Sequence, residues 1–114
     1  MRFGKVWGET RPILMKPQLE LHEISIRAGG FCSRHHHRSK YNMFYVISGQ
    51  LRIKTWKNHY DLIDETILGP GQSTIQEPGE DHQFEALTDV TCLELYWAEL
   101  HHDDIVRSDV GGSK

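Results

Sequence analysis

Three histidines in two separate motifs are the residues of this chain best suited to chemistry. His35 and His37 end the run Gly29-Gly-Phe-Cys-Ser-Arg-His-His-His, and His82 ends the distant motif Pro78-Gly-Glu-Asp-His. Side chains at positions i and i+2 of a strand project from the same face, so two imidazoles can meet a third from another strand. Three neutral imidazoles around a first-row transition metal leave coordination positions open for a substrate. The two motifs therefore predict a metal-centred pocket.

The composition is that of one ordinary globular domain. Of the 114 residues, 38% are hydrophobic and 25% are charged, and the net charge is −3 with neutral histidines. No basic surface is predicted, which argues against a nucleic-acid partner. No apolar stretch approaches the about 20 residues that span a bilayer, and the N-terminus lacks the apolar core of a secretory signal. We therefore predict a cytoplasmic protein with no membrane partner.

Short segments rich in β-branched and aromatic residues alternate with glycine and proline turns. Such spacing favours an all-β sandwich or barrel, and no segment carries a helical period. We predict one domain over residues 1–100 and a polar, flexible tail over residues 101–114. The segments predicted as strands are 18–27, 32–37, 42–48, 50–56, 65–68, 73–76, 83–87 and 91–99.

Alternation along the segment 42–48 predicts which of its side chains face the interior. Asn42, Phe44 and Val46 share one face, and Met43 and Tyr45 share the other. Because both faces are largely apolar, we expect the outer one to be covered by an N-terminal strand or by a second subunit. This expectation motivates a homodimer.

The last strands predict the character of the pocket. The inward residues that we expect there are His82, Phe84 and Ala86 on one strand and Leu93, Leu95 and Trp97 on the other. These would form an apolar small-molecule pocket with the metal at one end.

Several residues outside this pattern receive simple interpretations. Two cysteines make no disulfide framework, so both are expected to be thiols. Cys92 is expected in the core, and Cys32 on the strand face opposite His35. His22 and His59 carry no spacing signal and are predicted to lie on the surface, and His36 is predicted to point away from the two histidines beside it.

The motif spacings resemble the two conserved motifs of the cupin superfamily. The first stretch matches at Gly29, at the His35–His37 pair and at Gly49, and the second at Gly71, Pro78-Gly79 and His82. The resemblance implies a double-stranded β-helix, or cupin jelly roll, over roughly residues 19–99. It also implies a divalent metal bound by His35, His37 and His82.

A narrower likeness is to the cupin domain of type II mannose-6-phosphate isomerases. It is carried by Trp7-Gly8 near the start, by His37-Arg38 and by the apolar run into Val46-Ile-Ser-Gly49. This likeness implies an enzyme that isomerises a sugar phosphate. Basic residues that could meet a phosphate are nevertheless expected to be solvated surface charges; they are Arg34, Arg38, Lys40, Arg52 and Lys54.

Asn42 departs from the family pattern because most metal cupins place a glutamate ligand at this position. Its neutral amide oxygen is a weaker donor than a carboxylate, so Asn42 is either a fourth ligand or a hydrogen-bonding residue. The site then either holds a metal mainly through three histidines or has become a plain binding pocket. Zinc, iron, manganese and nickel all accept imidazole ligands, and the sequence does not distinguish among them.

Three functions follow from this set of residues. The first is a metal-dependent enzyme whose metal acts as a Lewis acid in isomerisation, although no general base stands out in the sequence. The second is a non-haem iron dioxygenase, because thiol dioxygenases are cupins that also lack the motif glutamate. The third is a small-molecule binding module without turnover.

Overall fold

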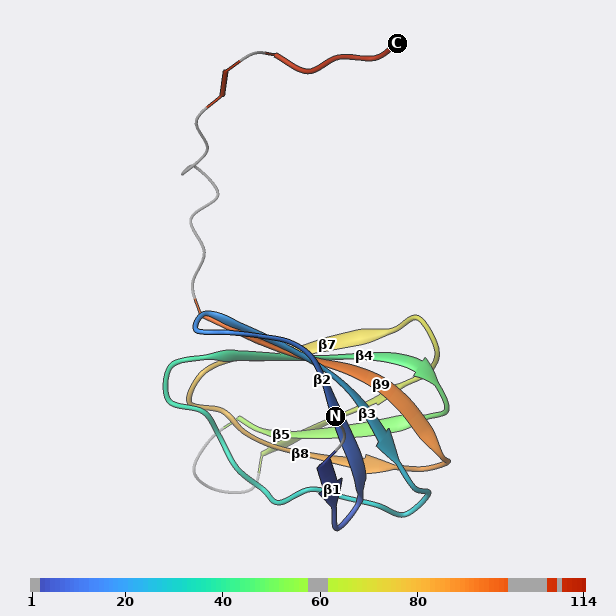
Figure 1. The fold of residues 1–114 in the computed structure, drawn as a ribbon. Helices are drawn as coiled ribbons and strands as arrows, with labels where there is room; N and C mark the ends of the chain where they lie inside the picture. Colours follow the sequence, from blue (N-terminus) through green and yellow to red (C-terminus); the bar gives the residue numbers. More distant parts are fainter. Residues whose placement is uncertain (1–2, 58–61, 99–106, 109) are drawn as a thin grey trace.

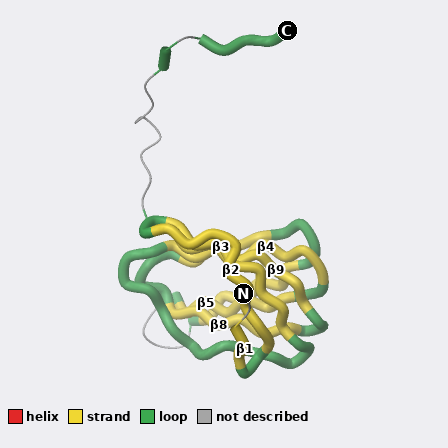
Figure 2. Tube along the Cα trace, in the orientation of Figure 1, coloured by secondary structure: helices red, strands yellow, loops and turns green. Residues whose placement is uncertain are grey.

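A computed structural model describes residues 3–57, 62–98, 107–108 and 110–114, and in these ranges it contains strands and loops but no helix (Figures 1 and 2). It follows that no helix in the described ranges is long and apolar enough to cross a membrane. The strands are β1 (Phe3–Lys5), β2 (Gly8–Lys16), β3 (Leu19–Ile26), β4 (Tyr41–Ser48), β5 (Leu51–Trp56), β6 (Ile63–Leu68), β7 (Ser73–Gln76), β8 (Asp81–Ala86) and β9 (Val90–Trp97).

Two antiparallel sheets form the barrel. The larger has the strand order β1-β2-β3-β9-β4-β7 and the smaller the order β6-β5-β8. Strand β5 shows why they pack together: Leu51, Ile53 and Thr55 are buried, while the alternate residues are only half-buried. Burying one face of each sheet against the other gives the all-β jelly roll that the sequence predicts. The apolar core consists of Ile24, Ile26, Cys32, Phe44, Val46, Leu51, Ile53, Leu68, Phe84, Ala86, Val90 and Cys92.

The predicted strands agree with the observed ones in the middle of the chain and fail at two places. Strands β1 and β2 are not among the predicted strands, and Pro12 lies inside the second of them. The register of β2 against β3 shifts between Pro12 and Leu14, and such a bulge tolerates a proline inside a strand. The segment 32–37 is not a strand; isolated bridges at Phe31 and His35 and hydrogen bonds between Cys32 and Phe84 connect this part of the chain to β8.

The face prediction is confirmed for β4 and wrong for β9. Phe44 is 1% exposed, and its partner across the ladder is Glu94, so Glu94 faces the interior. Tyr45 is 38% exposed, and its partner Leu93 therefore lies on the outer face. The prediction failed because the outward residues of β9 are the apolar ones. Cys92, Glu94 and Tyr96 are the inward residues of β9.

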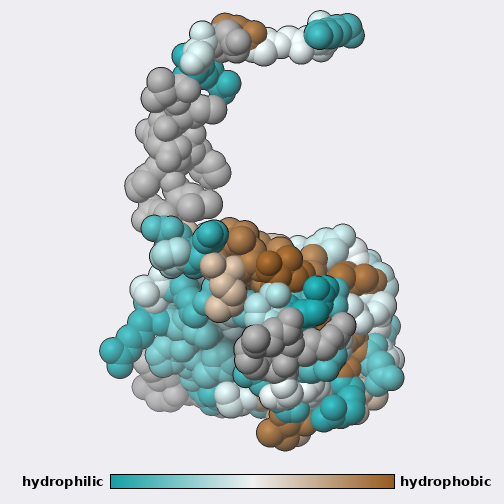
Figure 3. Space-filling model, viewed as in Figure 1, coloured by the Kyte–Doolittle hydropathy of each residue, from teal (hydrophilic) through white to brown (hydrophobic). Residues whose placement is uncertain are grey.

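The outer face of the larger sheet is apolar, and its apolar side chains gather along the upper side of the barrel in Figure 3. The N-terminal strands do not cover this face, because β1 and β2 extend the same sheet beside β3. The expectation of an N-terminal cover is therefore wrong. The large apolar side chains that are exposed on the strands of this sheet are Ile13, Leu14, Met15, Tyr45, Ile47 and Ile75; of these, Tyr45 and Ile75 lie on the outer face with Leu93 and Met43.

The end of the chain is described only in part. Residues 107–108 and 110–114 are exposed and form neither helix nor strand. The remainder of the predicted 101–114 tail, and His59, lie outside the described residues, so the division into a domain and a tail stays a prediction.

Candidate metal centre

Backbone hydrogen bonds place the two histidine motifs side by side. The His35 N–H donates to the His82 carbonyl over 3.1 Å, and the His82 N–H donates back to the His35 carbonyl over 2.8 Å. The Gly79 N–H donates to the His37 carbonyl over 2.8 Å. Gly79 has a φ of 84°, a left-handed conformation that glycine adopts at little cost. An irregular segment that carries His35 and His37, and a turn that leads into β8 with His82, thus position the three histidines, rather than two regular strands.

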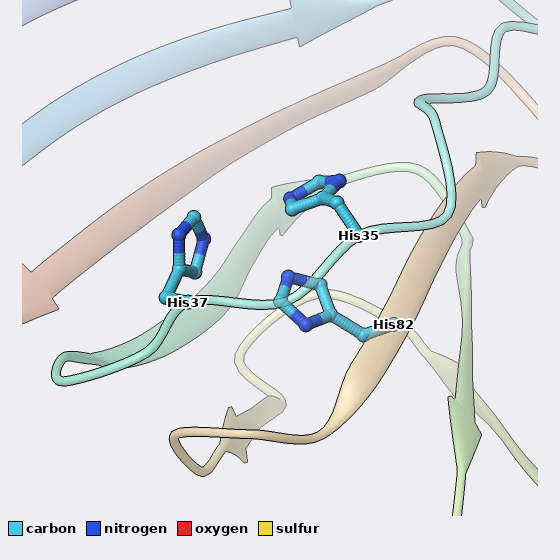
Figure 4. A group of neighbouring side chains, drawn as sticks. All are labelled: His35, His37 and His82. Carbon is cyan, nitrogen blue, oxygen red and sulfur yellow. The ribbon is translucent and has the colours of Figure 1, made fainter. Parts of the chain in front are cut away.

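The three imidazoles converge on one space. Figure 4 shows His35 and His37 from the 31–37 segment facing His82 from β8. One nitrogen of each ring lies within 4.8 Å of the others. The ring centroids are 4.6 Å apart for His35 and His82, 5.2 Å for His35 and His37, and 5.5 Å for His37 and His82. This spacing suits three ligands of one ion.

The nitrogens on the far side of two rings are held by backbone carbonyls. His35 Nδ1 donates to the Ser33 oxygen over 2.8 Å, and His82 Nδ1 donates to the Glu80 oxygen over 3.2 Å. A carbonyl only accepts, so the proton sits on Nδ1 and Nε2 keeps its lone pair. Within the described chain, the Nε2 atoms of His37 and His82 are buried without a hydrogen-bond partner. Unpartnered buried nitrogens are costly unless something binds them, so the donor set fits a metal ion.

Burial keeps the histidines in the form that binds metals. It lowers the pKa of His37 from 6.5 to about 4, with further contributions from the positive charge of Lys40 and from neighbouring histidines. Burial also lowers the pKa of His82. Both rings are therefore neutral at pH 7, and a neutral imidazole has the free lone pair that a metal requires.

Asn42 lies on the inward face of β4 and is 1% exposed. Its Nδ2 donates to the Leu95 carbonyl over 3.0 Å. Its Oδ1 is buried and has no hydrogen-bond partner among the described residues. A lone amide oxygen can serve a metal or a ligand hydroxyl, and its role as a fourth ligand stays a prediction.

Several polar and charged residues of the two motifs face away from the three histidines. His36 Nδ1 lies 2.8 Å from Asp81, as expected for a residue that points outward. Arg34 also reaches Asp81, over 2.9 Å. Arg52 pairs with Glu85 over 3.0 Å, so neither the carboxylate nor the guanidinium is free to serve the interior.

Two residues expected elsewhere lie on the interior side. Cys32 is buried beside His35, and its Sγ accepts the Phe84 N–H over 3.2 Å. Burial raises its thiol pKa to about 11, and its sulfur is not among the converging ligand atoms. The His22 side chain is only 13% exposed, so its surface assignment is wrong. Both errors arose because the irregular 31–37 segment and strand β2 were not predicted.

A cavity of about 370 Å³ opens beside His35. Trp7 and Phe84 form an edge-to-face pair in its wall, with ring centroids 5.0 Å apart. Glu94 and Tyr96 also line the cavity, and the Tyr96 hydroxyl donates to Glu94 Oε2 over 2.9 Å. Burial raises the pKa of the Glu94 carboxyl. The expected apolar pocket is therefore wrong, because polar residues of β9 and β3 face inward.

The sequence matches the profile of the family described as "Cupin domain" over residues 22–99. No curated protein matches the chain.

Solved structures share the fold at low sequence identity. KdgF from Halomonas sp. has a TM-score of 0.75 and 16% identity, over 88% of this chain and 89% of that one. The capsular polysaccharide assembling protein CapF from Staphylococcus aureus has a TM-score of 0.74 and 20% identity, over 91% of this chain and 29% of that one. Bacillus subtilis oxalate decarboxylase, a protein with Mn(II) centres, has a TM-score of 0.74 and 16% identity, over 86% of this chain and 27% of that one.

This chain thus spans less than a third of the last two proteins, and the likeness to all three shows the fold alone. The profile match covers more than half of the sequence and places the histidine motifs within it. This chain therefore belongs to the cupin family.

Proposed function

We propose that this protein is a metal-dependent enzyme that holds a divalent transition metal on His35, His37 and His82, with Asn42 as a fourth ligand. The observation that carries the proposal is the pair of buried, unpartnered Nε2 atoms on His37 and His82 that meet the third imidazole. The substrate is a small polar molecule in the adjoining cavity. The Mn(II) centres of the structurally similar oxalate decarboxylase are consistent with this proposal.

A divalent metal bound there supplies Lewis acidity, which polarises a carbonyl or hydroxyl group. This chemistry suits a sugar-phosphate isomerase-like enzyme. Lys5 and Lys40 line the cavity and can attract an anionic group, and the hydrogen-bonded pair of Tyr96 and Glu94 can orient hydroxyls. Of the basic residues considered from the sequence, Lys40 lies at the cavity, with its Nζ 4.2 Å from the centre of the Tyr96 ring.

A non-haem iron dioxygenase is the second candidate. It is favoured by a converging ligand group that, among the residues the structure describes, consists of histidines without a carboxylate. Oxygen uptake by the iron-loaded protein with small thiols, and none with sugar phosphates, would support the dioxygenase over the isomerase. A tightly held small molecule without turnover would instead indicate a binding module.

Elemental analysis of untagged protein by plasma mass spectrometry tests the metal site. We expect near-stoichiometric metal in the native chain and none in the His35→Ala/His82→Ala variant. His36→Ala is the matched control, because His36 lies between two proposed ligands but pairs with Asp81 outside. Native protein that holds no metal even after reconstitution with zinc, iron, manganese or nickel would overturn the proposal.

The same proposal includes a cytoplasmic homodimer. The cysteines are free thiols, as expected in a reducing compartment. The occupant of the apolar outer face is a second copy of the chain, which would cover Tyr45, Ile47 and Ile75, each exposed by 38–52%. Sedimentation at micromolar concentration should give twice the mass of one chain, and Ile75→Glu should shift it to the monomer. A monomeric native protein would rule out the dimer.

A further inference from the structure

The proposed ligands leave the charge of a divalent ion without a counter-charge. Three imidazoles and an amide are all neutral donors. The acidic residues that precede His82 do not supply the missing charge, because each pairs with a cation on the outside. Glu80 binds Lys57 over 3.0 Å, and Asp81 binds Arg34 over 2.9 Å.

A half-buried carboxylate that lacks a cationic partner among the described residues lies in the wall of the adjoining cavity. Glu94 faces inward from β9 beside Phe44, and it accepts a hydrogen bond from the Tyr96 hydroxyl over 2.9 Å. In the part of the chain that the structure describes, no lysine or arginine forms an ion pair with it. Burying a carboxylate is costly unless a cation or several hydrogen-bond donors compensate it.

Glu94 and the histidines border the same space. Glu94 lines the cavity together with His35. Tyr96, which donates to Glu94, packs edge-on against His37 with ring centroids 5.2 Å apart. The carboxylate therefore lies on the side of the site that His35 and His37 border, although its oxygens are not among the converging ligand atoms.

We propose that Glu94 is the counter-charge of the metal centre. It is a positioning residue that does not itself coordinate the ion, and its carboxylate balances the charge that the neutral Asn42 leaves uncompensated. Each half of the arrangement lacks what the other has. The histidines lack an anion, the carboxylate lacks a cation, and one divalent ion completes both. This inference rests on the proposed metal site and deepens it.

The first test measures the affinity of the whole protein for Co²⁺ by competition with a chelator. Residues beyond the ligands typically change metal affinity by about 10–100-fold, so we expect Glu94→Gln to weaken Co²⁺ binding by that factor. Glu94→Asp keeps the charge and should recover most of the loss. The matched control is Glu85→Gln, on β8, which removes an outward carboxylate paired with Arg52 and should leave the affinity nearly unchanged.

A second test moves the charge instead of removing it. Asn42→Asp in the Glu94→Gln background places one carboxylate back in the site, now on β4, and should restore Co²⁺ affinity. The visible absorption of bound Co²⁺ should change as well, because an oxygen anion then joins the ligands. Asn42→Asp alone is the control: its gain in Co²⁺ affinity should be smaller with native Glu94 than in the Glu94→Gln background, whereas a purely structural role for Glu94 would give equal gains.

Thermal melting of the metal-free proteins shows whether Glu94→Gln acts on metal binding or on folding. The metal-free Glu94→Gln protein should melt no lower than the metal-free native protein, because a neutral amide replaces a poorly compensated carboxylate. Equal Co²⁺ affinity in the native and E94Q proteins, or a failed rescue in a folded double variant, overturns the counter-charge while the metal site stands. Native protein that binds no Co²⁺ overturns the metal site, and the counter-charge with it.

Discussion

The two ends of the barrel are built from the same strands but carry opposite chemistry. Along the inward face of β4, the residues change from Val46 and Phe44 to Asn42. At one end these side chains pack into an apolar core, and at the other Asn42 Oδ1 is left without a hydrogen-bond partner in the described structure. The same change runs along Leu51, Ile53 and Thr55 on β5, along Ala86, Phe84 and His82 on β8, and along Cys92, Glu94 and Tyr96 on β9.

The ladder registers bring the polar residues to one end. Asn42 pairs with Gln76 and Tyr96, and Thr55 pairs with His82. Thr55 Oγ1 donates to Gln76 Oε1 over 2.7 Å and joins the two sheets there. The difference between the ends teaches that the apolar end holds the fold together, whereas the histidine end keeps buried polar atoms that stability alone would not favour.

The largest expected effect on stability comes from opening a cavity at the apolar end. Leu51 is 0% exposed, and Leu51→Ala should lower the free energy of unfolding by about 2–5 kcal/mol. The measurement is urea unfolding of metal-free protein. Thr55→Val, on the same face of β5 at the polar end, is the matched comparison; leaving the Gln76 oxygen unpaired should cost about 1–3 kcal/mol. A loss of stability in Leu51→Ala no larger than that in Thr55→Val would contradict the division of the barrel into an apolar end and a polar end.

Adding charge at the polar end should change metal binding rather than packing. Asn42→Glu introduces a carboxylate ligand and should tighten binding of a divalent metal by about tenfold, or about 1.4 kcal/mol. Titration calorimetry against the native protein measures this. An unchanged affinity would mean that position 42 does not face the metal.

Lowering the pH should reduce the folding stability of the metal-free protein through His37, which lies at the polar end. The pKa of His37 is lowered from 6.5 to about 4. Between these values the unfolded chain takes up a proton that the folded chain does not, so His37 reduces stability as the pH falls from 6.5 to 4 and has no effect on it above that window. The native protein should therefore lose more stability over this range than His37→Gln, as measured by unfolding at several pH values. Parallel curves would show that His37 is not buried as described.

The smallest effect concerns the two thiols. Burial raises the pKa of Cys32 to about 11 and that of Cys92 to about 12, so neither is a thiolate at pH 7. Both should react slowly with a thiol-reactive disulfide reagent in the folded protein and fully in urea. Cys32, beside the cavity, should react before Cys92, which is 0% exposed at the apolar end. Mass spectrometry of Cys32→Ser and Cys92→Ser would identify which thiol has reacted. Faster reaction of Cys92 than of Cys32 would count against the division of the barrel into an apolar end and a polar end.

The sequence by itself determined the features that depend on local spacing. Alternation predicts most strands from β3 onward and the inward face of β4, and glycine turns such as Gly79 mark the loops. The two motifs likewise identify the three histidines that the structure brings together. These predictions succeed because strand period and turn conformation are properties of neighbouring residues.

Tertiary structure alone decided which face of β9 is inward and what surrounds the histidines. Both faces of that strand offer acceptable residues, and the long-range ladder with β4 turns Glu94 inward and Leu93 outward. The 31–37 segment lacks a regular strand, so Cys32 comes to the interior through hydrogen bonds to β8. The inward face of β9 and the place of Cys32 depend on pairing partners far apart in the chain, which local periodicity does not specify.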